Sequence, residues 1–402
     1  MDASQQLSKK GQRVKKKKGD APLDAYQFIE SRKDLTILAK ALETATAIAV
    51  DMEADSMYHY KEKVCLVQVC ADNIHAVIDP IKVSDLSPLK KIFAQRGIRK
   101  IFHGADYDVR SLYRDFKLTI NNLFDTQLAS MYLGTRETGL DAVLHQRFGV
   151  RLNKAYQKKN WAQRPLPEDM IKYASEDVRY LIPLADMLRE ELDHKNRLYW
   201  VEEECHKLSH VRPAMNNDAP LFLKFKGAGR LKPKQLAILE ALLQVRDAIA
   251  REKDRPHFKI LSNTSLLKIV HETPTTLANL QAMNVISQKQ FDMYGRLLVA
   301  AVRKTRKNQS DSLPVYPKKK APRLSPRVPG RIRAIKNYRD KQANRFALDP
   351  ALLMNKALMS TIAISNPMDI SALRTIEEIK KWQIKEFGKD IVFILRGLHN
   401  GR

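Results

Sequence analysis

An internal repeat at an offset of 93 residues is the feature that most constrains how this chain can fold. The repeated positions include a charged pair, a proline, a leucine and a glycine: Arg246-Asp247 returns as Arg339-Asp340, Pro274 as Pro367, Leu280 as Leu373 and Gly295 as Gly388. In both copies, apolar residues recur at the three- and four-residue spacing of amphipathic helices. Agreement of several residue types at one offset indicates a duplicated unit. We therefore predict two small all-α domains, over residues 228–306 and 331–402.

The first half of the chain has the pattern of a mixed α/β domain, which we predict over residues 23–210. The apolar runs at 46–54, 64–70 and 73–80 are typical of consecutive strands, and residues 86–97 are typical of a helix that leads to a short strand at 99–103. Such an alternation predicts a mixed sheet flanked by helices.

Two carboxylates stand near the end of the first of these strands. Asp51 and Glu53 are two residues apart, so their side chains point to the same face of the strand. Met52 points to the other face, toward the predicted core. Carboxylate oxygens are the ligands that Mg²⁺ and Mn²⁺ prefer. The pair is therefore a candidate metal site.

A third candidate acid lies just after the strand at 99–103. A turn at Gly104 precedes a predicted helix that begins near Asp106, which suits Asp106 to the N-cap and puts Asp108 in the first turn. We predict that Asp108 is the functional acid and that Asp106 caps the helix. His103, at the end of the strand, is either a core histidine or a contact to a phosphate or nucleobase.

The fourth candidate acid, Asp177, shares a helix with a tyrosine. Tyr173 and Asp177 are four residues apart on a helix predicted after Pro167, so they lie on one face. Alone, a Tyr–Asp pair at this spacing is common on helix surfaces. Four acids that each lie at a strand end, or on a helix facing that end, indicate one site.

Basic residues concentrate in two segments of a chain whose formal net charge is +26. Residues 303–345 include 15 basic and 2 acidic side chains, and residues 1–22 form a basic tail that we predict to be disordered. The Pro-, Lys- and Arg-rich residues 307–330 are typical of an extended linker. Such segments either keep the protein in solution or attract the phosphates of a nucleic acid.

Several classes of protein are disfavoured. No apolar stretch of about 18 residues occurs, and no apolar segment follows the basic N-terminus, so we expect neither secretion nor a membrane span. We expect a cytoplasmic location, in which Cys65, Cys70 and Cys205 remain free thiols. The phosphate-binding motif G-x-x-x-x-G-K-[ST] is absent, which argues against a helicase.

The acids occur in three motifs that resemble those of a known superfamily. D-x-E on the first strand, H-x-x-x-x-D opening a helix and Y-x-x-x-D on a later helix are similar to the exonuclease motifs of the DEDDy superfamily. From about residue 24 onward the chain resembles the ribonuclease D family, with VCLVQVC, LFDTQLA and the segment around Trp161 as further similar stretches. The helical repeats resemble the paired HRDC domains of that family. The resemblance implies a ribonuclease-H-like exonuclease domain followed by two HRDC-like domains.

The resemblance also implies roles for individual residues. Two divalent metal ions, Mg²⁺ or Mn²⁺, would be held by Asp51, Glu53, Asp108 and Asp177, and Tyr173 would position the attacking water. Substrate contacts are expected from His103, Gln68, Lys154 and Trp161. The sequence departs from the family where Met52 and Ala54 replace Thr and Phe, and where Lys159 and Asn160 replace Ser and Asp. None of these departures is a predicted metal ligand.

The predicted activity is hydrolysis of RNA from its 3′ end, with release of nucleoside 5′-monophosphates. The family implies RNA with a free 3′ end as the partner, and precursors of tRNA and other structured RNAs as substrates. Two alternatives stay open. One is a DNA 3′–5′ exonuclease, because the same acids suit either polymer, and the other is a non-catalytic RNA-binding scaffold.

Overall fold

The computed structural model of the protein describes residues 26–213, 219–307, 313–317 and 325–400. The predicted basic tail, residues 1–22, lies outside these residues. The first domain contains a six-stranded sheet, with strands β1 (Gln27–Ile29), β2 (Ala47–Ala54), β3 (Val64–Ala71), β4 (Ile74–Ile78), β5 (Arg99–Phe102) and β6 (Leu123–Asp125). The strands at 46–54, 64–70, 73–80 and 99–103 were all predicted.

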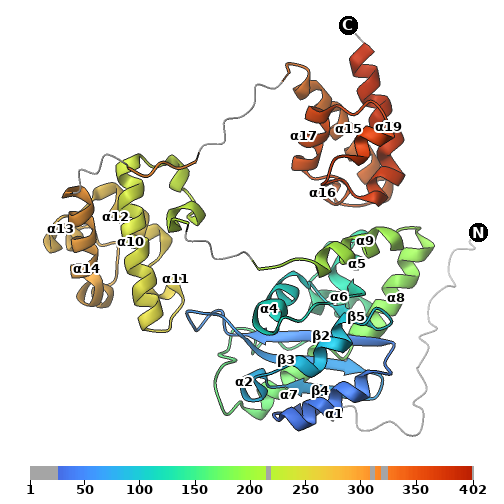
Figure 1. Cartoon of the computed structure of the whole chain (residues 1–402), viewed down its shortest axis with the longest axis horizontal. Helices are drawn as coiled ribbons and strands as arrows, with labels where there is room; N and C mark the ends of the chain where they lie inside the picture. Colours follow the sequence, from blue (N-terminus) through green and yellow to red (C-terminus); the bar gives the residue numbers. More distant parts are fainter. Residues whose placement is uncertain (1–25, 214–218, 308–312, 318–324, 401–402) are drawn as a thin grey trace, which may run out of the picture.

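The sheet is mixed, with strand order β1-β4-β3-β2-β5-β6. The central strands β2, β3 and β4 are antiparallel neighbours, whereas β1, β5 and β6 join the sheet in parallel. Helices surround it (Figure 1): α1 (Arg32–Leu42), α2 (Pro80–Val83), α3 (Lys90–Ala94), α4 (Asp106–Phe116), α5 (Thr126–Tyr132), α6 (Leu140–Phe148), α7 (Glu168–Asp177), α8 (Leu181–His194) and α9 (Leu198–Ser209). The prediction of a mixed sheet flanked by helices is confirmed.

The period of two along the strands gives the sheet two different faces. Val50, Met52, Val67 and Val69 belong to the larger apolar core. Leu66 and Val77, on the opposite face, belong to a smaller cluster that is completed by side chains of α7. Asp51 pairs with Gln68, and Gln68 pairs with Val77, so Asp51 points to the face covered by α7.

The two helical units repeat each other as the sequence predicts. The first contains α10 (Pro233–Glu252), α11 (His257–Ile260), α12 (Asn263–Glu272), α13 (Leu277–Ala282) and α14 (Gln288–Lys307). The second contains α15 (Val328–Phe346), α16 (Pro350–Leu353), α17 (Lys356–Ser365), α18 (Ile370–Arg374) and α19 (Lys381–Asn400). Two short 3₁₀ turns, η2 (Leu221–Lys224) and η3 (Ala228–Arg230), precede α10. A third, η1 (Ser87–Leu89), precedes α3 in the sheet domain.

The repeated glycine lies at a contact between two helices in both units. A Cβ at Gly295 would lie 3.5 Å from Leu277 of α13, and a Cβ at Gly388 would lie 3.1 Å from Ile370 of α18. At Gly388 a Cβ would be too close to α18, so glycine there lets α18 approach α19 closely, whereas the contact of Gly295 with α13 is an ordinary van der Waals distance.

The second helical unit starts earlier than predicted. Helix α15 begins at Val328, with a proline in its first turn, so the linker ends before residue 328 instead of at residue 330. The basic segment 303–345 is also largely helical, because it includes the end of α14 and most of α15. Within the linker, Tyr316 lies against Gly229 and donates a hydrogen bond to the Leu223 carbonyl, so this part packs on the first helical unit.

The second helical unit shares its apolar core with the sheet domain. Trp382 at the start of α19 stacks on Trp200 of α9, with ring centroids 4.6 Å apart. Arg197, which is 7% exposed, donates to the carbonyls of Tyr132 and Phe346 and so joins the two domains. Glu203 accepts hydrogen bonds from the backbone N–H groups of Lys381 and Trp382. These groups lie at the N-terminus of α19, where the helix itself offers them no acceptor.

The first helical unit contacts the loop that follows β2. Tyr60 donates a hydrogen bond to Asp247, at 2.8 Å, and His59 lies 2.7 Å from Asp254. In the same loop, Tyr58 donates to the Lys158 carbonyl at 2.6 Å. The loop thus links the end of β2 both to the helical unit and to the segment before α7.

We expect Trp382→Ala to lower the free energy of unfolding by about 3–5 kcal/mol, because it empties a buried stack between two domains. Denaturant titration followed by circular dichroism measures this change. Phe393→Ala on the same helix is the control, since Phe393 is 78% exposed and its loss should cost less than about 0.5 kcal/mol. Equal effects of the two substitutions would contradict the docking described above.

Candidate active site

Asp51 and Glu53 lie on β2 as the alternation predicts. Asp51 is opposite Gln68 of β3, and Glu53 is opposite Leu66. Met52 is 8% exposed and packs in the larger core, which fixes the strand register and so turns both carboxylates toward the other face.

Asp108 lies in the first turn of α4, where it is 9% exposed. The turn before this helix is held by Asp125, whose carboxylate accepts hydrogen bonds from the backbone of Gly104 and Ala105 at 3.0 and 2.8 Å. Gly104 has φ = 78°, a left-handed conformation that favours glycine. Asp108 therefore faces the site because its helix starts from a fixed turn.

The predicted N-cap role of Asp106 is wrong. Helix α4 begins at Asp106 itself, and no side chain caps it. Asp106 instead pairs with Arg110 one turn later, at 2.8 Å. Sequence reasoning missed Asp125, which holds this turn and also caps α5 through the N–H groups of Gln127 and Leu128. The position of Asp125 between an apolar strand and a helix is typical of an N-cap and could have identified it.

Tyr173 and Asp177 lie on one face of α7. The Tyr173 ring is packed between Tyr156 and Trp161, with centroids 5.5 and 6.0 Å away. Gln157, which sequence reasoning did not single out, lies near the Tyr173 hydroxyl and partly offsets the rise in its pKa. The tyrosine is thus held from the segment that precedes α7.

Burial raises the pKa values of all four acids, and repulsion from neighbouring carboxylates raises three of them further. Burial, followed by the charges of Asp51, Asp177 and Asp108, raises the pKa of Glu53 to about 10. Burial and Asp51 raise the pKa of Asp177 to about 8, and the same two causes raise the pKa of Asp108 well above its usual range. Burial raises the pKa of Asp51 to about 6. The four carboxylates therefore form one electrostatic unit.

A polar cavity of about 310 Å³ opens onto this unit. Its lining includes Asp51, Tyr173 and Asp177, together with Asp141 and Lys154. Lys154 is 59% exposed and pairs with Asp141 at 3.0 Å. The cavity thus brings carboxylates, a tyrosine hydroxyl and a movable cation to one place.

The four residues predicted to contact substrate have different positions. Only Lys154 offers an accessible charged group in the cavity. His103 lines the cavity, but its ring nitrogens lie 2.9 Å from the Thr126 hydroxyl and 2.8 Å from the Thr138 carbonyl, so neither is free for a phosphate or base. Gln68 is 0% and Trp161 1% exposed, and neither touches the cavity surface. The prediction of direct substrate contact by Gln68 and Trp161 is therefore corrected, because packing under α7 buries both.

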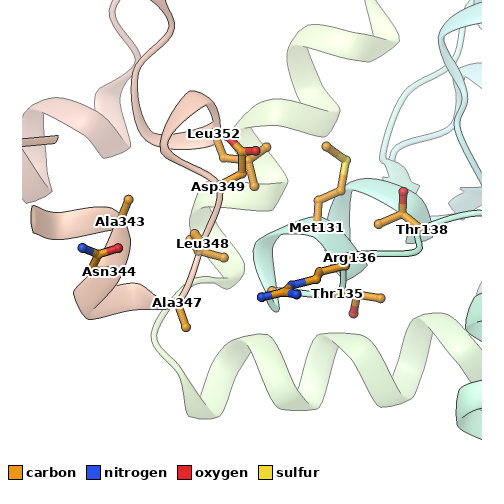
Figure 2. A pocket seen from close by; sticks show the side chains of 11 residues that line it. Met131, Thr135, Arg136, Thr138, Ala343, Asn344, Ala347, Leu348, Asp349 and Leu352 are labelled. Atoms are coloured by element: carbon orange, nitrogen blue, oxygen red, sulfur yellow. The ribbon is translucent and has the colours of Figure 1, made fainter. Parts of the chain in front are cut away.

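A second cavity, of about 760 Å³, lies next to the first. Figure 2 shows its lining: Met131, Thr135, Arg136 and Thr138 of the sheet domain face Asn344, Leu348 and Leu352 of the second helical unit. Thr138 lines this cavity and Gly139 lines the first, so one short segment separates the two.

The four acids suit hard divalent cations. The donor set is made of carboxylates alone, which favours Mg²⁺ or Mn²⁺ over zinc. The leading causes of the four pKa shifts are burial and neighbouring carboxylates. Among the described residues, no three or more histidine, cysteine or acidic side chains lie close enough together to hold a metal ion without moving.

Comparison with known proteins agrees with this geometry. Residues 26–193 match a family described as 3′-5′ exonuclease, and residues 235–302 and 329–395 match the HRDC domain. Ribonuclease D of Granulibacter bethesdensis is 27% identical over 92% of each chain. The RRP6-like 1 protein of Arabidopsis thaliana is 31% identical over 72% of this chain, which spans 48% of that relative's length. The catalytic core of RRP6 from Trypanosoma brucei is 30% identical, with a TM-score of 0.61, over 71% of this chain and 81% of that one.

Fold and site together define a 3′–5′ exonuclease domain followed by two HRDC domains. The chain is similar to curated ribonuclease D proteins over most of its length, and DEDD-type exonucleases normally use divalent metal ions. Because the chain spans less than half of the RRP6-like relative, the activity, substrates and partners of the whole protein are proposals. In the described residues, no helix is both long and apolar enough to cross a membrane.

The raised pKa values predict an unusual effect of pH on the metal-free protein. Between about pH 4, where unfolded carboxylates ionise, and the higher folded pKa values, the folded state binds more protons than the unfolded chain. These acids therefore stabilise the fold at low pH and destabilise it as pH rises through about 6 and 8. Asp51→Asn should relieve the repulsion, so in EDTA its melting temperature should exceed that of the wild type at pH 8 and differ little at pH 5.

Thermal unfolding of both proteins from pH 5 to pH 9 checks this difference. Subtracting the wild-type melting temperature from that of Asp51→Asn at each pH removes the contribution of the ionisable groups that the two proteins share. A melting-temperature difference between the two proteins that does not increase with pH would contradict the electrostatic coupling of the four acids.

Proposed function

We propose that the protein is a metal-dependent exoribonuclease that removes nucleotides from the 3′ end of RNA. The observation that carries the proposal is the arrangement of four carboxylates from β2, α4 and α7 whose pKa values are all raised, with two of them, Asp51 and Asp177, lining one polar cavity together with Tyr173. Such a site attracts cations and, through them, phosphate. A cytoplasmic location and tRNA precursors or other structured RNAs as substrates follow from the sequence and stay predictions.

The proposed metal ligands are Asp51, Glu53, Asp108 and Asp177, which would hold two Mg²⁺ or Mn²⁺ ions. When bound, such ions supply positive charge for the phosphate oxygens and make water acidic enough to act as a nucleophile near neutral pH. The chain's own residues then have to hold the scissile phosphate, exclude other water and orient the attacking one. Water adds to phosphorus, the bond to the 3′ oxygen breaks, and a nucleoside 5′-monophosphate leaves.

Tyr173 is the proposed orienting group. Burial and the charges of Asp177, Glu53 and Asp51 raise the pKa of its hydroxyl, so it stays protonated at neutral pH. A protonated hydroxyl donates a hydrogen bond and does not act as a base. Packing against Tyr156 and Trp161 supports this role because it fixes the ring.

The two adjoining cavities support a path for the strand that leads to the site. Lys154 lies at the first cavity, and Arg136 and Asn344 line the second, so cationic and amide side chains are available for phosphates along this route. The route runs between the exonuclease domain and the second HRDC domain (Figure 2). Deleting that domain would also expose Trp200, so point variants are the cleaner probe.

The activity is tested with single-stranded RNA and DNA of the same sequence, labelled at the 5′ end, in Mg²⁺, Mn²⁺ or EDTA. We expect stepwise shortening of the RNA with release of 5′-monophosphates, no reaction in EDTA and none with Asp51→Asn. Faster digestion of the DNA would favour the alternative of a DNA exonuclease. Absence of digestion in either metal would favour the binding scaffold.

A pair of variants separates Asp108 from its neighbour. Asp108→Asn should lower the rate at least about 100-fold, roughly 2.7 kcal/mol in the barrier, because it removes a proposed metal ligand. Asp106→Asn should change the rate less than about twofold, since it loses only a surface pair with Arg110 worth about 0.2–1 kcal/mol. Single-turnover rates on a short RNA measure both, and the reverse ranking would refute the assignment.

A further inference from the structure

Gln68 of β3 is a buried polar side chain without a partner. It is 0% exposed, and neither its Nε2 nor its Oε1 atom has a hydrogen bond. Among the residues that the structure describes, it is the one side chain with two such atoms. Burying an unpaired amide is costly, so a native protein that keeps one has a reason to do so.

The sheet register places this amide beside the acid site. Gln68 lies directly opposite Asp51 on β2, and opposed residues of antiparallel strands project to the same face. On its other side lies Val77 of β4, which belongs to the apolar cluster beneath Tyr173 and Ala174. The amide is therefore enclosed by the sheet and α7, with the Asp51 carboxylate as its neighbour across the strands.

Two other unpartnered atoms lie around the same site. The Ser111 hydroxyl is on α4, three residues after Asp108, and the Trp161 indole nitrogen belongs to the ring packed on Tyr173. Polar atoms without a hydrogen-bond partner thus lie near Asp51, Asp108 and Tyr173.

A purely structural role for Gln68 is disfavoured by a comparison within the chain. Gln383 of α19 is also buried, at 2% exposure, but both ends of its amide are bonded. Its Nε2 donates to the Leu353 carbonyl at 2.6 Å, and its Oε1 accepts from the Lys380 N–H at 2.9 Å. A glutamine that stabilises the fold is satisfied in this protein, and Gln68 is not.

We propose that Gln68 is a positioning residue, whose Nε2 donates a hydrogen bond to the Asp51 carboxylate when the acids hold their divalent cations. Cations bring the carboxylates together, and the amide then fixes which Asp51 oxygen faces the ions. Some residues form hydrogen bonds to a metal ligand without contacting the metal, and replacing them typically weakens metal affinity 10- to 100-fold. This role rests on the metal site proposed above.

The test is isothermal titration of the full-length protein with Mn²⁺, combined with thermal unfolding in EDTA. Gln68→Met keeps the side-chain length and removes both polar atoms. We expect it to weaken Mn²⁺ binding at least about 10-fold while leaving the metal-free melting temperature unchanged or higher. Gln383→Met is the matched control, which should lower the melting temperature and leave Mn²⁺ affinity unchanged.

The outcomes separate this role from the proposed function. Absence of Mn²⁺ binding by the wild type would overturn the metal site, and the role of Gln68 with it. Binding by the wild type with unchanged affinity in Gln68→Met would overturn the role of Gln68 alone. A melting temperature of metal-free Gln68→Met lowered as far as that of Gln383→Met would also overturn it, because the amide would then be bonded without metal.

Discussion

Electrostatic repulsion among four neighbouring carboxylates is the constraint on which the rest of the exonuclease domain depends. Each acid comes from an element that is fixed by something else: the register of β2 by Met52, the start of α4 by Asp125, and the position of α7 by its packing on Leu66 and Val77. Repulsion would push the acids apart on a flexible chain, so the scaffold must hold them. Burial strengthens the repulsion, because charges interact more strongly away from water.

The helical domains attach to the structure around this site. The loop after β2 ties the first HRDC domain to the catalytic strand through Tyr60 and to the segment before α7 through Tyr58. The second HRDC domain packs on α9 through Trp382, and Arg197 joins it to the end of α5. Both domains therefore contact elements that also position the proposed site.

Much of the fold was predictable because it depends on short-range patterns. The strands followed from apolar alternation, and the two helical units followed from the repeat, whose glycine lets α18 approach α19 closely in the second copy. The errors came where partners are distant in sequence. Asp106 occupied a position that resembles an N-cap, but Asp125, which is 19 residues away, already held the turn.

By itself the sequence determined the identity of the acids, their distribution over one strand and two helices, and the duplication of the helical unit. Local periodicity and residue chemistry suffice for these features. Only the tertiary structure decided that Trp161 and Gln68 are buried, that both ring nitrogens of His103 are occupied, and that Gln68 stands across from Asp51 without a partner. Burial and hydrogen bonding depend on which elements pack together, and the spacing of residues along a chain does not specify that.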